Sequence, residues 1–385
     1  MASVLIRNVG IMLSGDIASP ILDADSIVIE EGKIKAVGKG LKAPKGAMVI
    51  NAGGCAVAPG LMDSHCHVVL GDYTPRQQMQ NFLDSMVHGG VTTAISAGEV
   101  HLPGRPKDAL GAKVLAILAA KAWANLRPGG MKVLGGALIL EKGLTEDDFD
   151  ECAAAGVKVV GEIGLGSVKD PEEAAKMCAW AKARGMVVMM HTGGTSIPGS
   201  SVVGPEQVLK VRPSVVSHLN GGPTAVSTEQ ARQIIEGCDI PVEIVHCGNM
   251  QRAIEIGRMI AERGEFDRVL IGNDAPSGTG VVPLGILRVM ALLAGSAGIS
   301  PELVVCMATG NTARVYGLNR GRIAPGLEAD LVFMDAPMGS AGGDVLEALA
   351  VGDVPGISIV MIDGEVKVAK SRNTPPAVRK AQVAG

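Results

Sequence analysis

Along the middle of the chain, short apolar runs alternate with longer segments in which apolar residues recur at helical spacing. The apolar runs cover residues 57–63, 91–96, 132–139, 157–163, 187–191, 215–218, 242–246 and 269–274. The helical segments cover residues 76–88, 107–125, 145–155, 171–184, 228–237, 250–263 and 284–293. Buried strands that alternate with helices form parallel sheets. About eight such units in about 260 residues are typical of an α/β fold of the (β/α)8 TIM-barrel type; an open doubly wound sheet is the alternative.

Both ends of the chain have a different pattern. Short β-branched runs separated by Gly, Pro and Asp lie at residues 3–9, 26–30, 33–37 and 48–51, and again at 330–334, 357–362 and 366–368. Because neither end could bury its apolar face alone, we expect one small β-sandwich domain built from both. The expected division is 1–58 and 319–370 for this domain, 59–318 for the barrel, and 371–385 for a C-terminal tail.

Composition excludes several classes of protein. No stretch reaches the roughly 18 consecutive apolar residues of a membrane helix. The net charge is −4 and aromatic residues make up 2% of the chain, which argues against binding to nucleic acid. The seven cysteines include no C-x-x-C pair. They indicate reduced thiols, and we expect a cytoplasmic protein.

Polar residues follow the apolar runs at the end where a barrel places its active site. The first run leads into Asp63-Ser64-His65-Cys66-His67, and side chains two residues apart on an extended segment point to the same side. Imidazoles or carboxylates therefore gather from several strands: His65, His67, Glu162, His191, His218 and Asp274. Six such ligands exceed the need of one four-coordinate zinc ion and suit two adjacent divalent ions, with Glu162 as the bridge between them.

The Asp63–His67 segment after Ala58-Pro59-Gly60, together with the block Gly321-Arg-Ile-Ala-Pro-Gly-Leu-Glu-Ala-Asp-Leu331, resembles the amidohydrolase superfamily. Most binuclear members carry a carboxylated lysine at the bridging position, where this chain has Glu162. That departure and the segments around His191, His218 and Asp274 resemble a branch that opens a lactam in nicotinate degradation.

The resemblance implies a site, a reaction and an assembly. His65, His67, Glu162 and Asp274 would hold Zn²⁺, and Glu162, His191 and His218 would hold Fe²⁺ or a second Zn²⁺. A metal-bridging hydroxide would attack the lactam of 6-oxo-1,4,5,6-tetrahydronicotinate, with Asp274 as general base and then acid. The products would be 2-formylglutarate and ammonia, and the enzyme would be a homotetramer.

A carboxylated substrate calls for a cation in the pocket. Arg76 and Arg105 lie in the loops that follow the first and second strands, and Arg105 belongs to the Pro-containing segment His101-Leu-Pro-Gly-Arg-Pro-Lys107. We expect one of them to bind the carboxylate, although an ordinary surface ion pair is the simpler interpretation of each.

Two other functions remain. The first is another cyclic amidase of the superfamily, similar to dihydroorotase or hydantoinase, which would be expected to carry lysine where Glu162 stands. The second is a non-catalytic scaffold that has lost its metals, which the presence of all six ligand residues disfavours.

Overall fold

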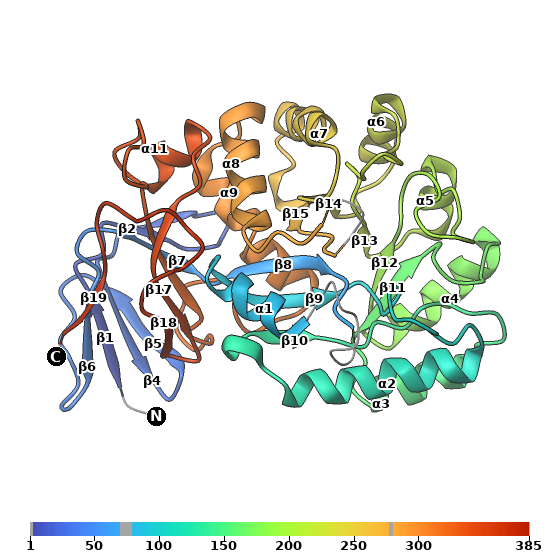
Figure 1. Cartoon of the computed structure of the whole chain (residues 1–385), viewed down its shortest axis with the longest axis horizontal. Helices are drawn as coiled ribbons and strands as arrows, with labels where there is room; N and C mark the ends of the chain where they lie inside the picture. Colours follow the sequence, from blue (N-terminus) through green and yellow to red (C-terminus); the bar gives the residue numbers. More distant parts are fainter. Residues whose placement is uncertain (1–2, 70–78, 277–279, 385) are drawn as a thin grey trace.

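The computed structural model describes residues 3–69, 79–276 and 280–384 (Figure 1). A group of β-strands from both ends of the chain lies on one side of the molecule, and alternating strands and helices form the other (Figure 1). Among the described residues, no helix combines the length and the apolar character needed to cross a membrane.

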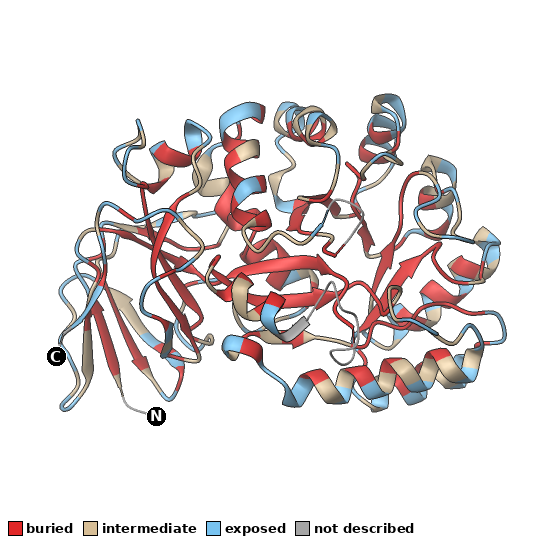
Figure 2. Ribbon diagram, viewed as in Figure 1, coloured by how far each residue is buried: buried red, intermediate tan, exposed pale blue. Residues whose placement is uncertain are grey.

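The alternating part contains two parallel sheets. The first has the strand order β10-β9-β8 and the second β11-β12-β13-β14-β15. Their bounds are β8 Leu61–Cys66, β9 Val91–Ser96, β10 Lys132–Leu134, β11 Val159–Ile163, β12 Val187–Met190, β13 Val215–Val216, β14 Val242–Val245 and β15 Val269–Gly272. Isolated parallel bridges join Leu138 to Val160 and Cys66 to Ala275, between the two sheets. Most residues of these strands are buried (Figure 2), and the prediction of parallel strands is confirmed.

Helices follow most of these strands. Their bounds are α1 Met79–Val87, α2 Ala109–Asn125, α3 Glu146–Ala154, α4 Pro171–Ala183, α5 Pro205–Val211, α6 Thr228–Gly237, α7 Met250–Arg263, α8 Gly285–Ala297, α9 Pro301–Met307, α10 Gly310–Val315 and α11 Val345–Ala350, with short 3-10 turns at Pro128–Gly130 and Phe266–Arg268. Capping side chains mark several of their starts: Asp170, for example, accepts hydrogen bonds from the backbone N–H groups of Glu172 and Glu173 at the start of α4.

The β-rich part contains two sheets, ordered β19-β6-β1-β4-β5 and β18-β17-β16-β7-β2-β3. Their bounds are β1 Val4–Arg7, β2 Ile11–Leu13, β3 Ile21–Leu22, β4 Ser26–Glu30, β5 Lys33–Gly38, β6 Met48–Asn51, β7 Ala56–Pro59, β16 Leu331–Asp335, β17 Gly356–Ile362, β18 Glu365–Val368 and β19 Gln382–Ala384. Side chains of both sheets, among them Ile6, Ile27, Val57 and Phe333, form one buried cluster. Strands from the two ends of the chain pair directly, β7 with β16 and β6 with β19.

The C-terminal residues are more ordered than the expected tail. Strand β19 extends a sheet, and the Arg379 guanidinium bonds to the buried carboxylate of Asp335 at 2.6 Å.

One predicted strand is two strands. The apolar run at residues 57–63 is divided at Gly60 into β7, which pairs antiparallel with β16, and β8, which pairs parallel with β9. A Cβ atom at Gly60 would lie 2.2 Å from the Thr92 hydroxyl oxygen, so the close approach there requires glycine. Both halves are buried, and their apolar pattern therefore gives no sign of the division.

Lys132, at the start of β10, joins the two parts of the molecule. Its ammonium lies 2.6 Å from Glu328 Oε2, 2.8 Å from Asp330 Oδ2 and 2.7 Å from Asp363 Oδ1. The Lys132 side chain is 13% exposed and that of Asp330 is 1% exposed, so water screens this network weakly.

We expect Lys132→Met to lower the free energy of unfolding by about 1.5–3 kcal/mol, because the buried Asp330 would lose its nearest cation while Arg320 and Arg127 still face the three carboxylates. Urea unfolding measures the change. The control is Lys39→Met, which removes an exposed ion pair with Asp23 and should cost less than about 1 kcal/mol. Equal losses in the two variants would contradict a special role for Lys132.

Candidate metal centre

The structure brings the six predicted ligand residues together. They come from the carboxyl ends of five strands that are far apart in the sequence: His65 lies in β8 and His67 directly after it, Glu162 lies in β11, His191 follows β12, His218 follows β13, and Asp274 follows β15. All four histidines and Glu162 are buried, and Asp274 is the most exposed of the set, with 17% of its side chain accessible.

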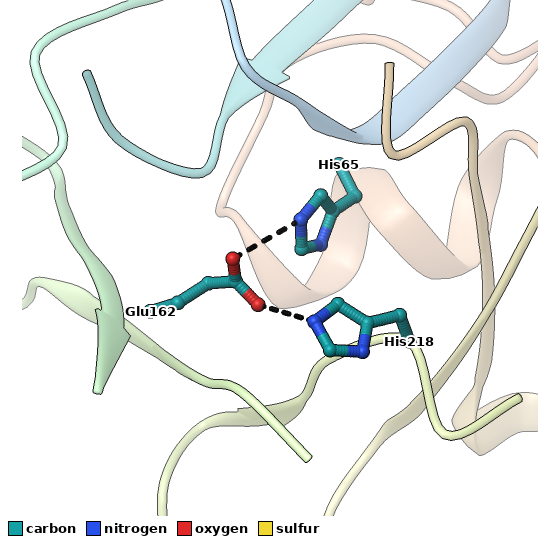
Figure 3. A group of neighbouring side chains, drawn as sticks. All are labelled: His65, Glu162 and His218. Carbon is teal, nitrogen blue, oxygen red and sulfur yellow. Dashed lines mark ion pairs between the residues drawn. The ribbon is translucent and has the colours of Figure 1, made fainter. Parts of the chain in front are cut away.

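Glu162 lies between two pairs of histidines. Its Oε2 atom is 3.6 Å from His65 Nε2 and 3.5 Å from His67 Nε2. Its Oε1 atom is 2.7 Å from His218 Nε2 and 4.0 Å from His191 Nδ1. Figure 3 shows the carboxylate pointing between the rings of His65 and His218, with one oxygen toward each. Each pair of imidazoles therefore faces a different oxygen of one carboxylate.

Asp274 lies beside only one of the two histidine pairs, that of His65 and His67. Its Oδ1 atom is 3.2 Å from His67 Nε2 and 3.5 Å from His65 Nε2. The ligand atoms of His65, His67 and Asp274 lie within 4.8 Å of one another, as do those of His65, Glu162 and His218. These two sets share His65, and Glu162 is the carboxylate that faces both histidine pairs.

The donor atoms fit divalent metal ions. Within each histidine pair, ring nitrogens approach one another, at 3.3 Å between His65 and His67 and at 3.2 Å between His191 and His218. The opposite nitrogens of three of these rings contact acceptors: His65 Nδ1 lies 2.7 Å from a Glu243 oxygen, His67 Nδ1 3.3 Å from the carbonyl of Gly98, and His191 Nε2 2.9 Å from that of Gly194. Because those nitrogens donate outward, the lone pairs of the others face the cluster. Imidazole and carboxylate donors suit Zn, Fe, Mn or Co.

The backbone is strained at two of these positions. His218 has φ 32° and Asp274 has φ 55°, in a region that non-glycine residues rarely adopt. Such strain persists where the surrounding structure enforces it, and it is concentrated at functional sites.

Electrostatics favour ionised carboxylates and one neutral imidazole in the cluster. Burial would raise the pKa of Glu162, but the neighbouring His218 and His65 outweigh it and hold this pKa well below its usual range. Burial also opposes ionisation of Asp274, yet the hydrogen bond with His67 and the charge of His65 leave its pKa lowered. Burial and the nearby His218 lower the pKa of His191 to about 4. Ionised carboxylates and a neutral imidazole are the forms that bind metals. Although burial opposes it, Glu243 and Glu162 raise the pKa of His65, and Glu162 raises that of His218, so metal binding would displace protons from these two rings.

Sequence reasoning missed Glu243, the residue that orients His65. Glu243 lies in β14 and is fully buried. Its Oε2 atom is 2.7 Å from His65 Nδ1, and its Oε1 atom accepts a hydrogen bond from the Ser64 hydroxyl at 2.6 Å. A charged residue inside a buried apolar run is the signal that could have found it, because such a carboxylate needs a partner.

We expect Glu243→Gln to weaken metal binding about 10- to 100-fold, because an amide holds His65 Nδ1–H less strongly than a carboxylate does. Metal content after dialysis against graded chelator measures the effect. Ser64→Ala, which removes the hydroxyl that donates to Glu243 but leaves the contacts of Glu243 with His65 and His218, should have a smaller effect. Affinity equal to that of the unmodified protein in Glu243→Gln would exclude this orienting role.

A cavity of about 350 Å³ opens onto the cluster. Besides five of the six ligand residues, it is lined by Val100, His101, Leu165, Ser196, Ile197, residues 221–224 and Cys247. Arg105 does not line it: the Arg105 guanidinium lies 2.9 Å from Glu141 Oε1 and borders a neighbouring cavity. Arg76, the other predicted substrate-binding residue, falls outside the described residues.

Comparison with known proteins connects this geometry to a family. The amidohydrolase family model matches residues 212–367. Enamidase from Eubacterium barkeri is 56% identical over 385 residues, which cover 100% of both chains. A crystal structure of enamidase, a member of the amidohydrolase superfamily, matches with a TM-score of 0.96 at 56% identity and covers 100% of both chains.

More distant matches agree in fold. A dihydroorotase from Geobacter metallireducens is 27% identical over 223 residues, which cover 57% of this chain and 50% of the relative. A β-aspartyl dipeptidase from Fervidobacterium islandicum matches with a TM-score of 0.66 at 19% identity, covering 96% of each chain.

Proposed function

Because the chain belongs to the amidohydrolase superfamily, we propose that it is a metal-dependent enzyme that hydrolyses the cyclic amide of 6-oxo-1,4,5,6-tetrahydronicotinate. The identity to enamidase over the full length of both chains supports a cyclic amide as the substrate. The observation that carries the proposal is the Glu162 carboxylate, which directs one oxygen toward each pair of histidines. A second candidate, dihydroorotase-like activity, is supported by relatives that are 25–28% identical and cover 46–60% of the chain.

We assign two metal ions to the cluster. His65, His67, Glu162 and Asp274 would hold Zn²⁺, and Glu162, His191 and His218 would hold Fe²⁺ or a second Zn²⁺. Such ions polarise a carbonyl group and lower the pKa of a bound water molecule. The protein's own contribution is to supply imidazoles and ionised carboxylates in fixed positions.

Asp274 is the proposed proton carrier. Its lowered pKa keeps the carboxylate ionised at neutral pH, ready to accept a proton from the attacking water. The same carboxyl group then donates that proton to the ring nitrogen as the C–N bond breaks. Ring opening yields an enamine, which tautomerises to an imine. A second water hydrolyses the imine to 2-formylglutarate and ammonia, so two waters are consumed in total.

The remaining features of the proposal concern architecture and assembly. We assign residues 59–318 to one closed (β/α)8 barrel, supported by the parallel bridges between its two sheets. Residues 1–58 and 319–370 would form a β-sandwich, supported by their shared hydrophobic cluster. The proposed assembly is a homotetramer in the cytoplasm; the seven cysteines are free, which is consistent with a reducing compartment.

The test is incubation of the metal-loaded protein with 6-oxo-1,4,5,6-tetrahydronicotinate, dihydroorotate and hydantoin in parallel. We expect ammonia release from the first substrate alone, because opening the other two rings leaves a carbamoyl group attached. Opening of dihydroorotate without turnover of the lactam would favour the second candidate. Purification without stoichiometric metal and without turnover of any of the three would identify a non-catalytic scaffold.

A further inference from the structure

A second, larger cavity adjoins the metal cluster. Its volume is about 730 Å³, and its lining comes from residues 100–107, Glu141, residues 165–169 and residues 197–199. These segments follow strands β9, β10, β11 and β12, on the side where the cluster lies. Four residues line both cavities: Val100, His101, Leu165 and Ile197. We call the larger one the outer cavity; it adjoins the smaller cavity across these shared residues.

The outer cavity carries an excess of positive charge. Among its described lining residues are three basic side chains, Arg105, Lys107 and Lys169, and one carboxylate, Glu141. Arg105 neutralises that carboxylate at 2.9 Å, and both side chains are buried, with 8% and 1% exposed. The other Glu141 oxygen accepts a hydrogen bond from the backbone of Ser167 at 2.9 Å. Lys107 and Lys169 therefore provide the uncompensated charge.

Both lysines can meet an incoming anion. Each is exposed, and neither forms an ion pair with any residue that the structure describes. Lys169 Nζ donates to the carbonyl of Gly199 at 2.5 Å, which uses one of its three N–H donors. Partial burial lowers the pKa of Lys169. In contrast, the described lining of the smaller cavity includes no lysine or arginine.

We infer that Lys107 and Lys169 form a carboxylate-binding subsite in the outer cavity, through which anionic lactams reach the metal cluster. The inference rests on the proposed function, whose substrate carries a carboxylate, and assigns the residues that meet that group. A concave surface lined by charge of one sign concentrates the oppositely charged ligand and raises its rate of association. Because both lysines are exposed, added salt weakens the attraction.

The experiment compares Lys107→Gln/Lys169→Gln with the unmodified enzyme and with Lys39→Gln, an exposed lysine of the β-rich part. Two substrates are assayed at low and high ionic strength: 6-oxo-1,4,5,6-tetrahydronicotinate and its neutral carboxamide. We expect kcat/KM for the anion to fall about tenfold in the double variant, and the salt dependence to disappear. The neutral lactam should change less than twofold, and Lys107→Arg/Lys169→Arg should restore the activity toward the anion. Equal losses for both substrates, or no loss for the anion, would overturn the inference.

A binding measurement separates this inference from the proposed function. Calorimetric titration with glutarate should detect binding that weakens with salt and is at least tenfold weaker in the glutamine double variant. If the unmodified protein turns over neither lactam yet binds glutarate in this way, the subsite stands and the proposed reaction falls. If glutarate binds equally to both proteins, the subsite is refuted even where the lactam is hydrolysed.

Discussion

Replacing Glu162 with glutamine is expected to reduce turnover at least about a thousandfold and to lower the metal content from two ions per chain to one or none. Glu162 directs its two oxygens toward separate histidine pairs, and a neutral amide cannot supply two anionic oxygens. Removing the metals removes several kcal/mol of transition-state stabilisation, which corresponds to this loss in rate. Elemental analysis together with the ammonia assay measures both effects.

The matched control for this variant is Glu172→Gln, on the helix that follows the same strand. The Glu172 side chain is 70% exposed and pairs with Lys210, so neither metal content nor turnover should change. If Glu162→Gln keeps two ions and retains turnover within tenfold of the unmodified enzyme, the proposal that Glu162 binds both metal ions is wrong.

For Asp274→Asn we expect kcat to fall about 10²- to 10⁴-fold while most of the metal remains. Asparagine retains an oxygen for the metal but cannot take up and return a proton. It also tolerates the positive φ of 55° at this position better than other residues do, so the backbone should keep its path. Steady-state kinetics give kcat, and circular dichroism checks the fold.

Asp239→Asn provides the comparison, because Asp239 is 93% exposed and pairs only with Arg212 among the described ion pairs. An Asp274→Asn enzyme with kcat close to that of the unmodified protein would assign the proton transfer to another group.

The periodicity of the sequence and the order of its residues predict which six side chains form the metal cluster. The i, i+2 spacing of His65 and His67, and the position of each other ligand at the end of an apolar run, depend on local geometry that sequence displays. The partners of those residues depend on contacts between strands. Glu243 contacts His65 across 178 positions of sequence, and Arg105 contacts Glu141 across 36; pattern alone specifies neither pairing.

For the fold as well, local patterns are predictable from the sequence, whereas features set by distant contacts are not. Helices α6 and α7 begin and end as the amphipathic pattern predicts, because each has one buried face and clear capping residues. The short helices α5, α9, α10 and α11 were not predicted, since six or seven residues contain too few turns to establish a period. The division at Gly60 depends on the nearby Thr92, which no periodicity reveals.

The pairing of β7 with β16 and of β6 with β19 has a consequence for synthesis on the ribosome. The first strands emerge early, whereas their partners are translated only after the whole metal-binding region. Until then, β6 and β7 have open hydrogen-bonding edges, the feature that promotes association between nascent chains. Strand β19 follows every other described strand in the sequence and closes the edge of β6, so a chain truncated before Gln382 would leave that edge unprotected.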